Sequence, residues 1–314
     1  MKKYFLAIFA AFFCSLILIL ILLPLLKKLK AGQYILGYVK EHAGKKGTPT
    51  MGGLAFITAI ILICLIFCGT NQRVLNLTLT IAGAFAVVGF LDDFLKIHRK
   101  DNGGLKPYQK IIFQLAISLL AAIYCHYNGI NYLYLPFCGG KTAYIGWGII
   151  PLATITFIAT VNCVNLTDGL DGLASGTVIA YLLAFATISL MQNNGFALPS
   201  FIGCGALAAF LIFNCNKASL FMGDTGSLAL GGFISCLSVF SGNTLYIPLL
   251  GIMFVVSGIS VIIQVIYYKK TRRRVFLMAP FHHHLQQTGK SEAKISFWYF
   301  AFTAVVGLIC IIFA

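Results

Sequence analysis

The sequence predicts an all-α integral membrane protein with about ten transmembrane helices, organised as one polytopic domain over residues 1–314. Of these residues, 59% are hydrophobic and 10% are charged, whereas soluble domains carry about 25% charged residues. The mean hydropathy is +0.91. A chain this apolar cannot cover a water-exposed surface with polar groups, so the composition favours a polytopic membrane protein.

Long apolar runs alternate with short breaks, and most runs approach the roughly 20 residues that a helix needs to cross a bilayer. The first run resembles a signal peptide, but it is too long and lacks a small-residue cleavage site, so it predicts a retained span. The run 245–268 contains Gly251 and Gly258, where the helix is expected to tilt or break. The predicted spans are 4–26, 52–69, 75–91, 109–127, 147–163, 174–191, 200–214, 227–242, 245–268 and 295–313.

The loop 131–146 carries aromatic and aliphatic residues on both sides of Gly139-Gly140. This pattern is typical of a short β-hairpin with a primed turn. An irregular loop with interfacial tyrosines is the alternative interpretation.

Basic residues indicate the orientation of the chain. Ten spans give five loops on one side, with four loops and both termini on the other. Nineteen of the 23 Lys and Arg residues fall on the five-loop side, so the positive-inside rule makes that side cytoplasmic and both termini external. The net charge of +15 follows from this bias, so no nucleic-acid partner is expected. The basic rims suit anionic membrane lipids or phosphorylated substrates.

Acidic residues gather on the same side, although the positive-inside rule does not require it. This concentration at span ends suggests a functional site. An ion-coupled transporter would place acids near the bilayer midplane, so acids at one rim favour an interfacial enzyme. All eight acids fall there: Glu41, Asp92, Asp93, Asp101, Asp168, Asp171, Asp224 and Glu292.

Two acidic motifs follow the cytoplasmic ends of the third and fifth predicted spans. Asp92 and Asp93 end an apolar run, with Lys96 one helical turn beyond Asp92. In "NLTDGLDGLA", residues 165–174, Asp168 and Asp171 lie three residues apart and share one face if a helix begins there. Glycines allow close approach of a ligand to the backbone, whereas helix capping is the simpler explanation for a single Asp.

Asp224 lies in "FMGDTGS", residues 221–227, where it can cap the eighth span or bind a metal. A lone carboxylate between glycine and threonine suits Mg²⁺, which takes hard oxygen ligands and usually only one or two carboxylates. The internal run His282 to His284 suits phosphate contact or proton transfer better than zinc, because successive residues do not converge on one ion. A basic flap, "KKGTPTMGG" over residues 45–53, can cover an anionic ligand.

Taken in order, these motifs resemble the polyprenyl-phosphate N-acetylhexosamine-1-phosphate transferases. The acidic pair at 92–93, "NLTDGLDGLA" and "FMGDTGS" look like the superfamily signatures, while "KKGTPTMGG" and "PFHHHL" resemble the phospho-N-acetylmuramoyl-pentapeptide transferase branch. The resemblance runs from about residue 40 to residue 294, and the ten-span plan extends it to the whole chain.

This resemblance implies a Mg²⁺-dependent reaction at the cytoplasmic face of the bacterial cytoplasmic membrane. Phospho-MurNAc-pentapeptide would move from UDP-MurNAc-pentapeptide to undecaprenyl phosphate, giving lipid I and UMP, and a homodimer is implied. Asp92, Asp93, Asp224 and His283 would be catalytic, and Asp224 and Asp168 would hold the metal. The implied substrate-binding residues are Lys45, Thr50, Lys96, Asn165, Asp168, Asp171, Asn214, Phe221 and His284, with Asn214 and Phe221 near the uracil.

Three rival functions remain at this point. A sister transferase would use UDP-N-acetylglucosamine, although the Thr-Pro-Thr-Met and triple-His segments argue against it. An ion-coupled transporter and a structural lipid-binding scaffold belong to other classes. A scaffold would keep its function when Asp224 is changed to Asn, whereas a transferase would lose UMP release.

Overall fold

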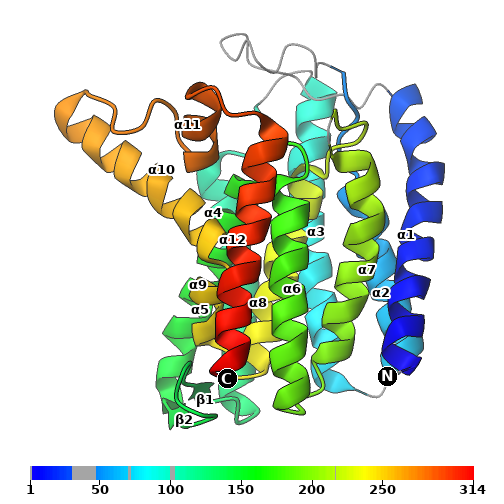
Figure 1. Ribbon diagram of the computed structural model, residues 1–314, viewed down its shortest axis with the longest axis vertical. Coiled ribbons are helices and arrows are strands. Elements are labelled where there is room, and N and C mark those ends of the chain that lie inside the picture. Colours follow the sequence, from blue (N-terminus) through cyan, green and yellow to red (C-terminus); the bar gives the residue numbers. More distant parts are fainter. Residues whose placement is uncertain (1, 30–46, 70–71, 100–102, 216) are drawn as a thin grey trace.

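The chain folds into a bundle of long helices with a β-hairpin at one end (Figure 1). The computed structural model describes residues 2–29, 47–69, 72–99, 103–215 and 217–314. Within these residues the helices are α1 (Lys2–Lys28), α2 (Gly53–Cys68), α3 (Arg73–Arg99), α4 (Pro107–Tyr127), α5 (Ile149–Thr167), α6 (Leu173–Met191), α7 (Ala197–Asn214), α8 (Gly223–Phe240), α9 (Ile247–Leu250), α10 (Ile252–Thr271), α11 (Phe281–Gln287) and α12 (Glu292–Ile312).

Nine helices in the described part of the chain are long and apolar enough to cross a membrane. Helix α2 is apolar but has only 16 residues, and it packs lengthwise against α1, α7 and α8. These helices confirm the prediction of an all-α multi-pass membrane protein and account for the ten predicted runs. The largest difference in length is in α3, which continues to Arg99 instead of ending near residue 91 and therefore carries the acidic pair on a helix.

The ninth predicted run breaks at Gly251, as the two glycines in that run suggested. Short α9 ends at Leu250, and α10 begins at Ile252. A side chain at Gly251 would lie 2.8 Å from the carbonyl oxygen of Ile247 and 2.9 Å from the Phe254 ring. Beyond this break α10 leans away from the bundle, and α11 returns toward it (Figure 1).

The predicted hairpin is confirmed, and it has a primed turn at the two glycines. Strands β1 (Tyr132–Tyr134) and β2 (Thr142–Tyr144) are antiparallel, with Leu133 opposite Ala143. Gly139 and Gly140 both have positive φ, +60° and +75°, and the Lys141 N–H donates to the Cys138 carbonyl at 3.4 Å. Positive φ at both central residues is the requirement of a type I′ turn.

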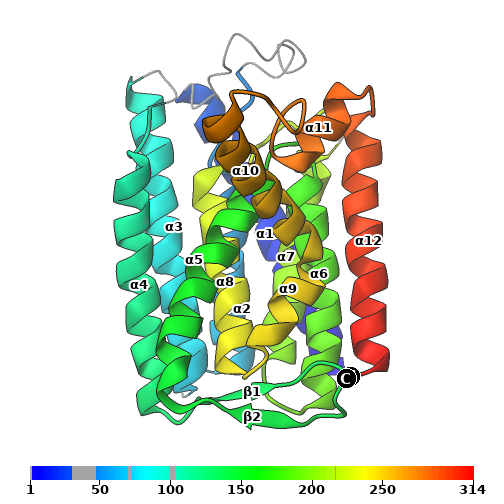
Figure 2. The ribbon, with the colours of Figure 1, turned by 90° about the vertical axis from the view of Figure 1, so that its left-hand side faces the viewer.

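Helix α8 lies at the centre of the bundle and packs against α2, α3 and α5 (Figure 2). Its residues from Thr225 to Phe240 are all buried, whereas α1 exposes Phe5, Phe9 and Phe13 by more than half. An apolar surface on a peripheral helix is expected where lipid replaces water. The polar residues in the first turn of α8 lie close to the ends of α3 and α5.

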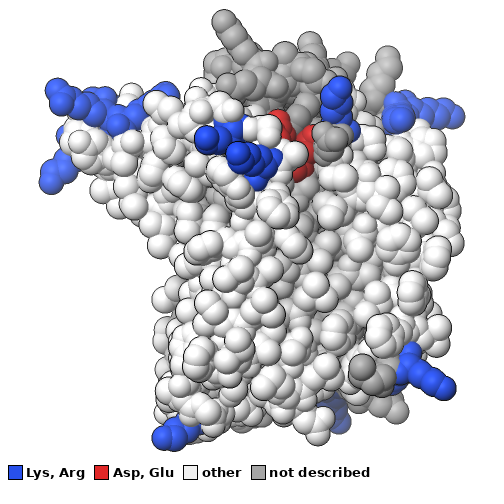
Figure 3. Space-filling view, viewed as in Figure 1, with Lys and Arg blue, Asp and Glu red and all other residues white. Residues whose placement is uncertain are grey.

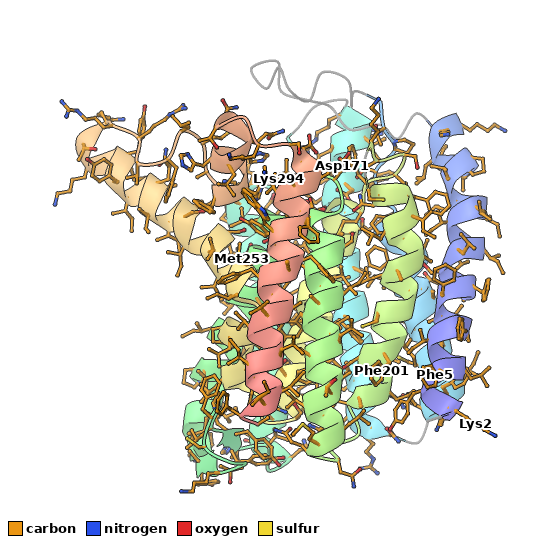
Figure 4. All side chains as sticks on the ribbon, viewed as in Figure 1. Lys2, Phe5, Asp171, Phe201, Met253 and Lys294 are labelled. Carbon is orange, nitrogen blue, oxygen red and sulfur yellow. The ribbon has the colours of Figure 1, made fainter. Side chains whose placement is uncertain are left out.

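The acids lie at the end of the bundle opposite both termini. Asp171 and Lys294 are at one end and Lys2 is at the other (Figure 4), and the acidic surface appears at the same end as most of the basic residues (Figure 3). The described acids come from the end of α3, the α5–α6 loop and the starts of α8 and α12. Their predicted position on one side of the protein is confirmed for these residues.

Candidate active site

Three carboxylates converge where the end of α3 crosses the start of α8. Asp92, Asp93 and Asp224 each offer an oxygen, and these oxygens lie within 4.8 Å of one another. Asp92 and Asp93 are buried, and the Asp224 side chain keeps 17% of its exposure. Consecutive residues on a helix point about 100° apart, so the two acids of α3 reach different parts of this cluster.

Asp93 holds the first turn of α8. Its Oδ2 accepts hydrogen bonds from the Thr225 N–H at 2.9 Å and the Thr225 hydroxyl at 2.7 Å, and its Oδ1 accepts one from the Asp224 N–H at 3.1 Å. N–H groups in the first turn of a helix have no acceptor within the helix, and a carboxylate there also meets the positive end of the helix dipole. Asp93 therefore caps α8 from another helix.

Asp92 and Asp224 share two lysines. Asp92 Oδ2 lies 2.6 Å from Lys96 Nζ and 3.0 Å from Lys110 Nζ. Asp224 Oδ2 lies 3.3 Å from Lys96 Nζ and 2.5 Å from Lys110 Nζ. The other oxygen of Asp92 accepts the Leu105 N–H at 2.7 Å, which ties the α3–α4 loop to the site. The site thus alternates negative and positive groups.

Asn165, from the last turn of α5, orients the remaining oxygen of Asp224. Its side-chain amide donates to Asp224 Oδ1 at 3.0 Å and to Ser227 Oγ at 2.8 Å. Asp224 is consequently held from three helices, α3, α4 and α5, through charge and hydrogen bonding.

The chemistry of this cluster fits a divalent metal ion. Three carboxylates with ligand atoms within 4.8 Å supply the hard oxygens that such ions prefer. Three neighbouring carboxylates repel one another unless positive charge lies close to them. Among the described residues, Lys96 and Lys110 provide such charge. The cluster contains Asp224, one of the two residues predicted to hold a metal.

Asp168 lies outside the group of three carboxylates whose oxygens are within 4.8 Å. It follows the end of α5, where its N–H donates to the Asn165 carbonyl at 3.1 Å. Removal from water, and then the charges of Asp224, Asp93 and Asp171, raise the pKa of Asp168 well above its ordinary value. A cation bound in this region would favour its ionised form.

Asp171 and Asn214 hold loops together. Asp171 Oδ2 accepts the Ala218 N–H at 2.9 Å, its own N–H donates to Glu292 at 3.3 Å, and its carbonyl accepts the Ser296 hydroxyl at 2.8 Å. Asn214 is buried, where it accepts from Ser175 at 2.9 Å and donates to the Leu220 carbonyl at 3.1 Å. Both residues hold the α7–α8 loop, Asp171 through Ala218 and Asn214 through Leu220.

Phe221 and Thr50 lie where the segment before α2 meets the segment before α8. The Phe221 N–H donates to the Pro49 carbonyl at 2.8 Å, and its carbonyl accepts the Gly52 N–H at 2.8 Å. A side chain at Gly223 would lie 2.8 Å from Thr50 Oγ1 and overlap Asp93 Oδ2, so Thr50 is next to the triad. Lys45, predicted to contact substrate, lies outside the described residues.

The histidines of α11 face the α5–α6 loop. A side chain at Gly169 would lie 3.0 Å from His283 Nε2 and would overlap the ring of His282. His283 Nδ1 pairs with Gln286 at 3.2 Å, whereas His284 Nδ1 accepts the Leu277 N–H at 3.3 Å and its ring packs on Phe281. The structure therefore places His283 beside Gly169, the residue after Asp168, and ties His284 to the segment before α11.

One residue of this region, Lys110, was not singled out from the sequence. Lys110 was counted only among the bases of a cytoplasmic loop, yet it sits on α4 between Asp92 and Asp224. His282, the first of the three predicted histidines, is buried against Gly169, and its ring is tilted against that of His283 with ring centroids 4.4 Å apart. The signal for Lys110 was its place in the chain, because it is the fourth residue of the helix that begins at Pro107.

Comparison with known proteins agrees with this arrangement. Residues 74–242 match the family model Glycosyl transferase family 4, and residues 45–57 match phospho-N-acetylmuramoyl-pentapeptide-transferase signature 1. Proteins named phospho-N-acetylmuramoyl-pentapeptide-transferase share 41% identity over 308 residues in Clostridioides difficile and 37% over 306 residues in Acetivibrio thermocellus. These alignments cover 96% of this chain and 95% and 92% of the respective relatives.

Proposed function

The chain belongs to the phospho-N-acetylmuramoyl-pentapeptide-transferase family, and we infer from this membership that it transfers phospho-MurNAc-pentapeptide from UDP-MurNAc-pentapeptide to undecaprenyl phosphate. The products are lipid I and UMP, and the reaction belongs to peptidoglycan synthesis. The acidic site at one end of a multi-pass bundle supports this inference, because a lipid substrate and a soluble nucleotide can meet only at a membrane surface.

We propose Mg²⁺ as the metal, the bacterial cytoplasmic membrane as the location, and the acidic end as the cytoplasmic face. The sequence asymmetry of Lys and Arg supports this orientation. Membrane lipids surround the apolar faces, and a homodimer is proposed from the family resemblance alone.

The observation that carries the proposal is the alternation of Asp92, Lys96, Lys110 and Asp224 around one point. A phosphate that approaches a pyrophosphate is repelled by it, so a catalyst for this reaction must neutralise negative charge. A bound Mg²⁺ would supply part of this neutralisation and would hold phosphate oxygens. If a metal were bound to Asp92 and Asp224, Lys96 and Lys110 would be available to neutralise the remaining negative charge of the substrate phosphates.

The contacts of each acid support different roles. We propose Asp224 and Asp92 as the residues that hold the metal, because their oxygens face the lysines rather than the backbone of another helix. Asp93 is proposed to position Asp224, because both its oxygens accept hydrogen bonds from α8. Asp168 is proposed as a further residue that holds the metal and orients the bound substrate.

The remaining predicted residues are proposed to surround the two substrates. Thr50, Phe221 and Asn214 flank the α7–α8 loop, where the uracil is proposed to bind, with Asp171 fixing that loop. His283, His284 and Lys45 are proposed to contact phosphate or sugar. Asn165 acts through Asp224.

The test is the Asp224→Asn variant in purified protein supplied with undecaprenyl phosphate and UDP-MurNAc-pentapeptide. We expect near-complete loss of UMP release at normal folded yield, because the amide cannot replace a charged metal ligand. Lys141→Gln, at the opposite end of the molecule, should keep wild-type turnover. Undiminished UMP release by Asp224→Asn would contradict the proposed site.

The same purified protein can be tested for two rival functions. Activity with UDP-N-acetylglucosamine alone would identify a sister transferase instead. Solute transport in liposomes without UMP release would identify a transporter.

A further inference from the structure

The first turn of α8, which carries Asp224, is in backbone contact with α3. Gly89 makes this contact possible: a Cβ there would overlap the carbonyl oxygen of Asp224 and lie 2.6 Å from Thr225 Cα. These are backbone atoms, so they cannot rotate aside as a flexible side chain would. Any residue larger than glycine must push the two helices apart or shift one along the other.

The opposite side of the same turn is in contact with α2. A Cβ on Gly53 would overlap the backbone of Gly226 and lie 3.0 Å from the Met222 carbonyl oxygen. In turn, a Cβ on Gly226 would lie 2.9 Å from both Gly53 Cα and the Phe56 ring. The start of α8 is therefore fixed from two sides by contacts that only glycine permits.

These contacts are close in sequence to the acids. Gly89 precedes Asp92 and Asp93 by about one helical turn on α3, and it faces Asp224 itself. Helices in close contact behave as rigid bodies. If α8 shifts relative to α3 at Gly89, the distance between Asp92 and Asp224 therefore changes by a similar amount.

We propose that Gly89 and Gly53 are positioning residues that set the spacing of the three carboxylates for the metal. This inference rests on the proposed function, which requires the metal at Asp224. Mg²⁺ demands near-ideal octahedral geometry at about 2.0–2.1 Å, and a misplacement of about 1 Å in an active site can cost about a hundredfold in rate. Helix separation at one glycine is enough to produce such a misplacement.

The chain offers a matched control on the same helix. A Cβ on Gly83 of α3 would meet no atom within 4 Å among the described residues. Replacing glycine by alanine inside a helix favours the helix by about 1 kcal/mol in both cases. Gly89→Ala and Gly83→Ala therefore share the change in helix propensity and differ in the contact with α8.

The experiment titrates Mg²⁺ into wild type, Gly89→Ala, Gly53→Ala and Gly83→Ala, purified in detergent. Melting temperature against Mg²⁺ concentration reports binding without turnover, and UMP release is measured in parallel. We expect the half-saturating Mg²⁺ concentration to rise at least about tenfold for Gly89→Ala and Gly53→Ala, in line with the cost of a displaced site. Gly83→Ala should match wild type.

Three results would overturn the inference. The first is a wild-type Mg²⁺ titration for Gly89→Ala and Gly53→Ala. The second is an equal loss in Gly83→Ala, and the third is failure of both contact variants to fold while Gly83→Ala folds, which would assign the glycines to the fold instead of the spacing. A wild-type protein that binds Mg²⁺ but releases no UMP would instead contradict the proposed function, and the Mg²⁺ titrations would still decide the role of the glycines.

Discussion

At the scale of single residues, the adjacent acids Asp92 and Asp93 bind different partners within the same carboxylate cluster. Asp93 directs both oxygens at the backbone and hydroxyl of α8, while Asp92 faces Lys96 and Lys110. Adjacent residues diverge by about 100° on a helix, so the two acids need not share a role. The contacts now assign a partner to each.

We predict that Asp93→Asn and Asp92→Asn both lower turnover strongly, but that only Asp93→Asn markedly lowers the melting temperature. An amide at position 93 presents N–H groups to the donors of α8, and an unsatisfied buried group costs about 1–3 kcal/mol. After Asp92→Asn, Lys96 and Lys110 keep Asp224 as a partner. UMP release and thermal unfolding of the purified variants check this.

Thr225→Val provides the control for this assignment. Its effect on stability should be non-additive with Asp93→Asn, by about 0.5–3 kcal/mol for groups in direct contact, because Thr225 donates its hydroxyl to Asp93. Equal losses of stability for the two acid variants would contradict the division of roles.

At this scale, the spacing of residues along the sequence does not show which side chains from different helices meet. Sequence reasoning identified the three acids of the cluster, but placed Asp168 beside Asp224 as a metal ligand, and this assignment stays a prediction. It overlooked Lys110, because one lysine after a proline looks the same as the other bases of a cytoplasmic loop. Only the crossing of α3, α4 and α8 shows that this lysine reaches two carboxylates.

At the scale of elements, the loops around the site are held by buried polar residues. Asp171 joins the α5–α6 loop to the α7–α8 loop through Ala218 and to α12 through Ser296. Loops normally have few such contacts and move more than the helices they connect. Here the α5–α6 and α7–α8 loops are fixed to each other by a hydrogen bond between the Asp171 side chain and the Ala218 backbone.

Asp171→Ala should therefore lower the melting temperature and raise KM for the nucleotide substrate more than it lowers kcat. The Ala218 N–H loses its acceptor, a change worth about 1–3 kcal/mol when the group stays buried. Steady-state kinetics and thermal unfolding measure the two effects. Asp171→Asn retains an oxygen that can accept this N–H and should recover part of both losses. A fall in kcat alone would argue for direct participation in the chemistry.

The helices themselves were largely predictable, because hydropathy dictates which segments cross a bilayer. The break at Gly251 and the hairpin turn at Gly139-Gly140 were also predictable, since glycine marks both kinds of backbone. The end of α3 was not. Asp92, Asp93 and Lys96 look like the close of a span, yet pairing among them and with α8 lets the helix continue to Arg99.

At the scale of the whole molecule, the elements that carry the described acids reach the end of the bundle opposite the two termini (Figure 1), and the acidic surface visible in Figure 3 lies at that end. The proposed orientation puts that end in the cytoplasm. Two native cysteines mark the two ends: Cys138 is exposed in the hairpin, and Cys215 is exposed after α7. Each can report its side of the membrane.

A membrane-impermeant maleimide added to intact spheroplasts should label Cys138 and leave Cys215 unlabelled until the membrane is opened. Cys138→Ser and Cys215→Ser identify each signal by mass spectrometry of the labelled protein. Labelling of Cys215 but not of Cys138 in intact spheroplasts would reverse the orientation and place the acids outside.

The ion pairs of the site also bear on how the protein is made. Asp92 and Asp93 leave the ribosome more than 100 residues before Asp224, so the unfinished chain carries two adjacent carboxylates with no α8 to receive them. Lys96 follows one helical turn after Asp92 on α3, and Lys110 follows on α4. Both lysines pair with Asp92 in the folded protein. Both lysines are therefore synthesised before Asp224 and are available as counter-charges to Asp92 during membrane insertion, before α8 exists.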